Sequence, residues 1–404
     1  MVTELMAPRQ LELIEKVRHL GKTVIQPNAA QWDRDQTYPW EIITALQEEK
    51  LMGVWIPEEY GGLGMGVLDL CIVVEELSRF CGGVGVAFAV NALGSFPILL
   101  GGTEEQKKTW LPPIARGEKL ISFGLSEKIS GSDAGSMITK AIRDGNEYVI
   151  SGEKKWNTNG GAATIYTIYA TTDPTRGHRG VSAFILEKGH PNFEIGYTED
   201  KMGIRTAAVR ELYLDQCRVP AERLLGAKEG IGFANAMMTL DRARPGVAAQ
   251  ALGLAQGALD VTAEYLLHHT MDHPKHFLQA DDFPLPEDFE TVPMASEQAV
   301  QFKLAELATK IEAARQLVYT AATAIDKGVK NVSQVSAMCK LFATETAMEV
   351  TSECMTMWGV AGIWRENPIE KYYRDAKITQ IYEGTNQIQR LVIARNFLRG
   401  YGNM

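Results

Sequence analysis

The chain has 404 residues and a net charge of −9, with 45% hydrophobic and 23% charged residues. This length exceeds what one hydrophobic core usually fills, so two or three packed units are expected. The composition excludes a largely disordered chain. An acidic balance without a block rich in lysine and arginine disfavours a nucleic-acid partner, because such affinity depends on neutralising phosphates.

The cysteines and the apolar runs indicate the compartment. Five cysteines form no CxxC pair, so neither a zinc site nor a disulfide framework is predicted. Residues 1–10 lack the apolar core of a secretion signal, and no uninterrupted apolar run long enough to span a bilayer is evident. We therefore predict reduced, buried thiols, no membrane span and a cytoplasmic location.

Hydrophobic periodicity divides the chain into three parts. Apolar residues recur at three- and four-residue steps up to about residue 117 and again after residue 230, whereas β-rich runs and turn signals lie between. We predict a mostly α fold with a central β domain: an N-terminal all-α domain (1–119), a small antiparallel β-barrel or sandwich (120–230) and a C-terminal four-helix bundle (231–404). Residues 268–295 have no sustained period and are predicted to form a loop excursion.

One carboxylate near the C-terminus stands apart. Residues 381–390 read Ile-Tyr-Glu-Gly-Thr-Asn-Gln-Ile-Gln-Arg, with Glu383 between an aromatic residue and a glycine, just ahead of a helix-forming run. A carboxylate that is desolvated and fixed in place can act as a general base. The alternative is a helix-start carboxylate that only answers the positive end of the helix dipole.

Two polar segments accompany the predicted strands. Residues 123–135 are rich in glycine and hydroxyls, which can bring backbone N–H groups against a flat polar ligand, although a simple connector has the same composition. Residues 156–160 read Trp-Asn-Thr-Asn-Gly. An aromatic beside a hydroxyl suits a ring ligand with apolar faces and a polar edge, and a core tryptophan is the alternative.

A fourth segment, residues 241–245, reads Asp-Arg-Ala-Arg-Pro on a predicted helix. Pro245 cannot donate to the helix ladder, so a kink is expected there. The charged residues form either a ligand contact or a surface salt bridge.

These four segments resemble those of the FAD-dependent acyl-CoA dehydrogenases. The resemblance covers nearly the whole chain in the family's order: a helical unit, a β unit, a second helical unit and the terminal glutamate segment. The resemblance implies α,β-dehydrogenation of an acyl-CoA thioester to the trans-2-enoyl-CoA. Glu383 would abstract the α-proton, flavin N5 would take the β-hydride, and an electron-transferring flavoprotein would receive the electrons. It also implies a homotetramer built as a dimer of dimers.

The resemblance assigns roles residue by residue. One branch of the family carries its catalytic glutamate at the position of Ala243, which leaves Glu383 as the base, and we predict that apolar burial raises the pKa of Glu383. The implied cofactor-binding residues are Phe123, Leu125, Ser126, Trp156, Thr158, Gly359, Thr385 and Gln387. The implied substrate-binding residues are Ser132, Asp241, Arg244, Tyr382 and Gly384.

The chain departs from the family where the flavin diphosphate is expected. Many relatives have an arginine after the helix that ends near residue 267, and this chain has His-His-Thr-Met-Asp-His-Pro-Lys-His instead. Residues 357–362 also replace a more glycine-rich stretch. Either His269, Lys275 or His276 supplies a substitute cation, or FAD is held more weakly. No metal site is predicted, because the proline after His273 disfavours a shared helix face with His269.

Substrate clues come from small residues. Gly85 stands where glutaryl-specific relatives place an arginine, which disfavours that subfamily. Gly85, Ala89 and Ala243 are expected to leave volume at the acyl end for a branched, cyclic or aryl-substituted acid. Two alternatives keep the fold: an acyl-CoA oxidase, and a non-catalytic member that has lost its cofactor.

Overall fold

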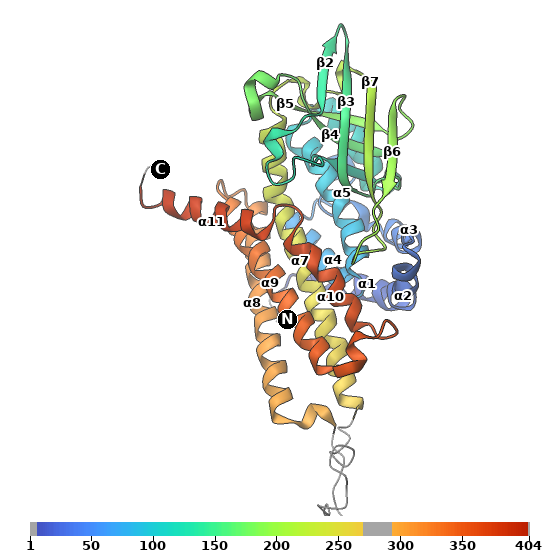
Figure 1. Ribbon diagram of the computed structural model, residues 1–404, viewed down its shortest axis with the longest axis vertical. Coiled ribbons are helices and arrows are strands. Elements are labelled where there is room, and N and C mark those ends of the chain that lie inside the picture. The colour runs from blue at the N-terminus through green and yellow to red at the C-terminus, as the bar shows by residue number, and fades with distance from the viewer. Residues whose placement is uncertain (1–5, 270–292, 403–404) are drawn as a thin grey trace, which may run out of the picture.

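Helical domains flank a β domain along the chain (Figure 1). The computed structural model describes residues 6–269 and 293–402. The predicted mostly α class with a central β domain is confirmed. The N-terminal helices are α1 (Pro8–Leu20), α2 (Gln26–Asp35), α3 (Trp40–Glu48), α4 (Val67–Ser78), α5 (Gly82–Gly101) and α6 (Glu104–Ala115), and a π-helical segment (Gly21–Ile25) joins the first two.

The start of α6 shows how sequence fixes a boundary. Thr103 Oγ1 accepts from the N–H of Gln106 at 3.2 Å, and Gln106 Oε1 accepts from the N–H of Thr103 at 3.1 Å. This reciprocal capping box satisfies two backbone donors that a helix leaves unpaired. Glu104 and Glu105 in the first turn also face the positive end of the helix dipole.

Helix α5 corrects one prediction. It is long and apolar enough to cross a membrane, contrary to the expectation that the chain contains no such run. However, 78% of its apolar window is buried inside the protein. A core helix surrounded by other elements is apolar on all faces, and this burial accounts for the composition of α5.

The β domain is a seven-stranded sheet in the order β1-β4-β2-β3-β7-β6, with β5 also paired to β4. Its pairings include parallel ones, β1 with β4 and β2 with β4, so the sheet is mixed and the wholly antiparallel expectation is wrong. Adjacent turn signals suggested hairpins, but a parallel neighbour is set by a long connection that local patterns do not show. The strands are β1 (Ile121–Gly124), β2 (Lys140–Asp144), β3 (Glu147–Thr158), β4 (Ile165–Thr171), β5 (Val181–Glu187), β6 (Phe193–Thr198) and β7 (Val209–Pro220).

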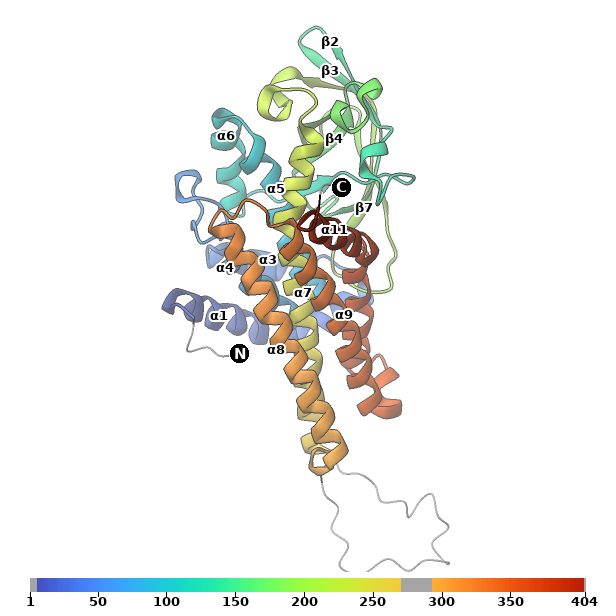
Figure 2. The ribbon, with the colours of Figure 1, turned by 90° about the vertical axis from the view of Figure 1, so that its left-hand side faces the viewer.

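The C-terminal helices are α7 (Gly232–His268), α8 (Gln298–Asp326), α9 (Ser333–Met357), α10 (Ile369–Lys377) and α11 (Asn386–Arg399). Helix α7 runs from the β domain down the molecule beside α8 and α9, while α11 projects sideways (Figures 1 and 2). Helix α7 has Pro245 in its interior and continues as one helix through this residue. Helix α7 also packs against α4 and α5, so the N-terminal and C-terminal helices share one core.

Two remaining predictions concern cysteines and the excursion. All five cysteines are buried and free, as expected for reduced thiols. Helix α7 ends at His268 and α8 begins at Gln298. Most of the predicted excursion, including His273, Lys275 and His276, lies in 270–292, outside the described residues.

Candidate active site

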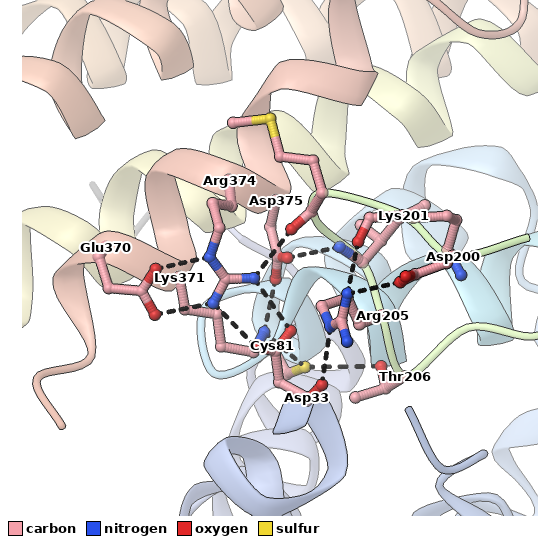
Figure 3. A network of polar contacts seen from close by, with 12 residues as sticks. Asp33, Cys81, Asp200, Lys201, Arg205, Thr206, Glu370, Lys371, Arg374 and Asp375 are labelled. Atoms are coloured by element: carbon pink, nitrogen blue, oxygen red, sulfur yellow. Dashed lines mark hydrogen bonds and ion pairs between the residues drawn. The ribbon is translucent and has the colours of Figure 1, made fainter. Parts of the chain in front are cut away.

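The segment that carries Glu383 follows α10, and a network of ion pairs holds α10 in place (Figure 3). Arg374 lies between Asp33 of α2, at 2.8 Å, and Glu370, at 2.5 Å. Asp375 accepts from the N–H of Ile204, at 2.5 Å, in the loop between β6 and β7. All three domains therefore meet at α10 and fix the starting point of the Glu383 segment.

Glu383 occupies an unusual backbone and electrostatic position. Its φ is +50°, in the left-handed region that favours glycine. Its Oε2 atom is buried and finds no hydrogen-bond partner in the described part of the chain. Burial raises the pKa of Glu383 to about 7, although the charges of Lys340 and Arg244 act in the opposite direction. The predicted upward shift is confirmed, and its cause is desolvation.

Glu383 does not cap the start of α11. Thr385 is the N-cap, and its hydroxyl accepts from the N–H of Ile388 at 3.3 Å. Glu383 precedes the cap by two residues, so the helix start is capped without its carboxylate.

The neighbours of Glu383 tie the segment to the interior. Tyr382 donates its hydroxyl to Gln250 of α7, whose amide donates to the carbonyl of Gly82 at 2.8 Å. The ring of Tyr382 packs against a cluster of Val86, Ile204 and Ala207. This contact places the segment against α5 and the β domain at once.

The charged pair on α7 lies inside the protein. Arg244 is 5% exposed, and its Nη1 contacts Asp241 Oδ1 at 2.5 Å. Ser333 of α9 also donates to Asp241. Arg244 Nε is buried with no partner among residues 6–269 and 293–402. The burial of Arg244 excludes a simple surface salt bridge, and its unpaired N–H suits a ligand acceptor.

The polar segments of the β domain lie side by side. Ser126 accepts through its backbone oxygen from the N–H of Lys155 at 2.9 Å, which brings residues 125–127 beside the end of β3. The Trp156 side chain is 56% exposed and has a φ of +65°, so it is not a core tryptophan. Thr158 is half-buried nearby on β3, and its carbonyl accepts from Ser122 of β1 at 2.6 Å.

The other implied ligand residues are more scattered. Leu125 is buried, Phe123 packs edge-on against Tyr169, and Ser132 and Gln387 are exposed. Gly359 lies just past the end of α9, roughly 28 Å along the helix axis from Lys340 at 1.5 Å per residue. Within one protomer, therefore, the structure does not bring Gly359 to Glu383.

Sequence analysis missed Lys340, a fully buried lysine on α9. Its ammonium donates to the Gly384 carbonyl and to Asn386 Oδ1, both at 2.9 Å. A signal existed, because Lys340 shares a helix face with the buried alanines Ala337, Ala343 and Ala347. A lone cation in such an apolar stripe needs a partner from another element.

The structure overturns the inference drawn from Gly85. A Cβ at this position would lie 1.9 Å from the hydroxyl oxygen of Ser78 on α4. The missing side chain thus permits the close approach of α4 and α5, and it leaves no volume for an acyl chain. Position 85 faces a neighbouring helix, so it gives no evidence on substrate preference.

Three aromatic rings stack near residue 268, where the sequence departs from the family pattern. Tyr265 stacks between Trp358 and His269, with ring centroids 3.9 and 3.8 Å apart. His269 Nδ1 lies 2.8 Å from the Tyr265 carbonyl. Of the three substitute cations, the structure describes only His269.

Comparison with known proteins agrees with this architecture. Three family models match the chain: the acyl-CoA dehydrogenase N-terminal domain over residues 7–118, the middle domain over 122–217, and the C-terminal domain over 230–274 and 286–398. The chain belongs to the acyl-CoA dehydrogenase family. It is therefore an oxidoreductase acting on acyl-CoA, and FAD is its cofactor.

Individual relatives align over almost their full length. A probable acyl-CoA dehydrogenase, FadE25, of Mycobacterium tuberculosis is 43% identical over 388 residues, covering 96% of this chain and 95% of that protein. The butyryl-CoA dehydrogenase of Megasphaera elsdenii superposes with a TM-score of 0.90 at 38% identity, covering 98% and 99% of the two chains. A chain from a structure described as the electron transferring flavoprotein of Acidaminococcus fermentans gives a TM-score of 0.90 at 42% identity, with the same coverage.

The residues present fit the cofactor on physical grounds. An exposed indole at Trp156 beside the hydroxyl-bearing Thr158 offers a face and a polar contact for a flat ring. The buried carboxylate oxygen of Glu383 has no hydrogen-bond partner among the described residues, so it offers an acceptor site to a ligand.

Proposed function

We propose that this protein dehydrogenates an acyl-CoA thioester between its α and β carbons, with Glu383 as the general base. One observation carries the proposal: a buried carboxylate oxygen that has no hydrogen-bond partner in the described part of the chain, on a group whose pKa is raised to about 7. A base is most effective when its pKa lies near the working pH. The α-proton beside a thioester carbonyl suits such a base in a water-poor site.

The remaining residues bind and orient. Arg244, held by Asp241, would offer its unpaired Nε–H to the coenzyme A part of the substrate. Tyr382 and Gly384 would line the reacting end beside Glu383, and Ser132 would contact the pantetheine or phosphate part from its exposed loop. The product of the proposed reaction is the trans-2-enoyl-CoA.

The β domain and the C-terminal segment would hold FAD. Phe123, Leu125 and Ser126 would lie along the flavin edge, with Trp156 and Thr158 beside the ring. Gly359, Thr385 and Gln387 would approach the rest of the cofactor. When bound, FAD supplies the acceptor for the β-hydride. His269 is the described candidate for the missing arginine near the diphosphate.

Electron transfer and assembly extend the proposal. A chain associated with an electron transferring flavoprotein structure is 42% identical to this one, which supports such a flavoprotein as the electron acceptor. Helix α11 projects from the body (Figure 1) and has exposed apolar side chains, Leu391, Phe397 and Leu398. An exposed apolar surface favours contact with other copies of this chain, and we propose that they cover it in a homotetramer.

The test is anaerobic reduction of the flavin. The purified holoenzyme is mixed with straight, branched, cyclic and aryl-substituted acyl-CoAs, and loss of the visible flavin band is followed. We expect bleaching by at least one thioester, and a fall of about a thousandfold in that rate for Glu383→Gln, in line with general-base contributions. Unchanged bleaching by the variant would refute the role of Glu383.

Two controls address the alternatives. Peroxide release at the turnover rate in air would indicate an oxidase instead of a dehydrogenase. A protein that cannot be loaded with FAD would indicate a non-catalytic member. The acyl-CoA that bleaches fastest identifies the substrate class.

A further inference from the structure

The side chain of Lys340 on α9 contacts the segment that carries Glu383. The residue is fully buried on α9, and its Nζ lies 2.9 Å from both the Gly384 carbonyl and Asn386 Oδ1. Asn386 is itself fixed by Thr344, one helical turn along α9, through a bond of 3.0 Å from its Nδ2. Both acceptors of the ammonium are neutral, and they belong to the first and third residues after Glu383.

The carbonyl of Gly384 is held twice. Besides Lys340, Gln389 of α11 donates to it at 2.8 Å. Glu383 and Gly384 have φ values of +50° and +89°, a left-handed pair that a glutamate adopts only when its surroundings enforce it. The two donors therefore clamp the turn that aims the carboxylate of Glu383.

The charge of Lys340 also acts on the carboxylate. The charged groups that face this site are Glu383, together with Arg244 and its partner Asp241 on α7. Glu345 of α9 also approaches the site, since its Oε1 lies 3.5 Å from Asn386 Nδ2, and it is paired with Arg390 of α11. The pair of Lys310 on α8 with Glu349 is exposed, and α10 carries its charges in the network of Figure 3. Among the described residues no ion pair joins Lys340 to Glu383, but the charge of the buried ammonium favours the ionised form of that carboxyl.

We propose that Lys340 is a positioning residue for Glu383: it clamps the turn through the Gly384 carbonyl and favours the ionised carboxylate that accepts the proton. This inference rests on the proposed function. It agrees with the pKa of Lys340, which burial lowers to about 7 while Glu383 acts to raise it.

Three variants separate the clamp from the charge. Lys340→Met removes both, Lys340→Arg keeps the charge, and Gln389→Leu removes a neutral donor to the Gly384 carbonyl and, at 3.4 Å, to the Glu383 carbonyl. Each is measured as the holoenzyme, by the rate of anaerobic flavin reduction between pH 5.5 and 9 with the best acyl-CoA. Circular dichroism and FAD content show whether each variant folds.

We expect Lys340→Met to move the acidic limb of the pH profile upward by about one unit, a loss of about tenfold near pH 6. The loss shrinks toward pH 9, where Glu383 ionises without help. Lys340→Arg should leave the midpoint near that of the wild type, and Gln389→Leu should lower the rate by the same factor at every pH. An unchanged midpoint in a folded Lys340→Met protein would overturn the proposal, even if Glu383→Gln is inactive.

A second readout is independent of turnover. The infrared band of the protonated Glu383 carboxyl is identified as the band that is present in the wild type and absent in Glu383→Gln. Its intensity is then followed against pH in the wild type and in Lys340→Met. The carboxyl should stay protonated to higher pH without the lysine. If no acyl-CoA reduces the wild type, the proposed function fails, yet this titration still decides whether Lys340 favours ionisation. If Lys340→Met does not fold, the same carboxyl titration is made in Lys340→Arg and Gln389→Leu. A shift of the Glu383 pKa in Gln389→Leu but not in Lys340→Arg would assign the effect to the clamp on the turn and overturn the role of the charge.

Discussion

Lys154 in the β domain and Lys340 beneath Glu383 are both fully buried, yet their environments differ. Lys154 Nζ contacts the carboxylate of Glu127 directly at 2.7 Å. That carboxylate also accepts from the backbone N–H groups of Ile138 and Thr139, at 2.7 and 3.0 Å. Lys340, by contrast, donates to two neutral oxygens.

The pKa values of the two carboxylates, Glu127 and Glu383, are shifted in opposite directions. Burial alone would raise the pKa of Glu127, but the Lys154 charge and the hydrogen bonds outweigh it and lower that pKa. The pKa of Glu383 is raised to about 7, because Lys340 and Arg244 do not offset its burial. Complete pairing makes a buried carboxylate structural, and incomplete pairing leaves one that can take a proton.

The largest expected effect comes from breaking the complete pair. Glu127→Gln leaves the Lys154 ammonium buried without its counter-ion, and we expect a loss of about 3 kcal/mol in the free energy of unfolding. Urea unfolding of the FAD-loaded protein at pH 7.5 measures it. Because the pKa of Glu127 is lowered on folding, its contribution is present at neutral pH and disappears as the pH falls. The gap between variant and wild type should therefore narrow in acid, and a constant gap would contradict the pairing argument.

The matched change in the incomplete pair should act with the opposite sign. The pKa of Glu383 rises from 4.5 to about 7 on folding, so this carboxyl favours the folded state in acid and the benefit is lost as the pH rises through 7. We expect Glu383→Gln to be more stable than the wild type by about 3 kcal/mol at pH 8.5 and nearly equal to it near pH 4.5. Urea titrations at the two pH values measure this. A less stable variant at pH 8.5 would show that the carboxylate is better paired than its neighbours indicate.

A steric change gives a reference that should not depend on pH. Gly85→Ala places a Cβ 1.9 Å from the Ser78 hydroxyl oxygen and 3.1 Å from the Ser78 Cβ. The hydroxyl must rotate away and the packing of α4 against α5 must adjust, at a cost of about 1 kcal/mol. Thermal or urea unfolding should show the same loss at pH 6 and pH 8.5. If the variant instead changes the preferred acyl-CoA without loss of stability, position 85 would face the substrate after all.

How much the sequence reveals depends on how local each feature is. The segments around Ser126, Trp156, Arg244 and Glu383 are contiguous runs, and the helix start at α6 is a four-residue signal, so all could be recognised without a structure. The Lys340 contact spans 44 residues and the Arg374–Asp33 pair spans 341. Such contacts, like the parallel pairing of β1 with β4, are created by folding and leave no local pattern.

The smallest effect on stability is expected from a residue outside both buried pairs. Trp156 is 56% exposed and contacts the Lys155 ammonium, which lies 4.9 Å from its ring centroid. Trp156→Ala should change the free energy of unfolding of the FAD-free protein by less than about 1 kcal/mol. If the indole lies beside the flavin, its loss should raise the FAD dissociation constant by about fivefold, because aromatic stacking contributes about 1 kcal/mol. Flavin fluorescence on titration measures this affinity, with Trp40→Ala as the control, since Trp40 is 50% exposed on α3 and has no proposed ligand. Equal FAD affinity in both variants would remove Trp156 from the cofactor site, whereas a loss confined to Trp156→Ala would show that its exposure serves the ligand.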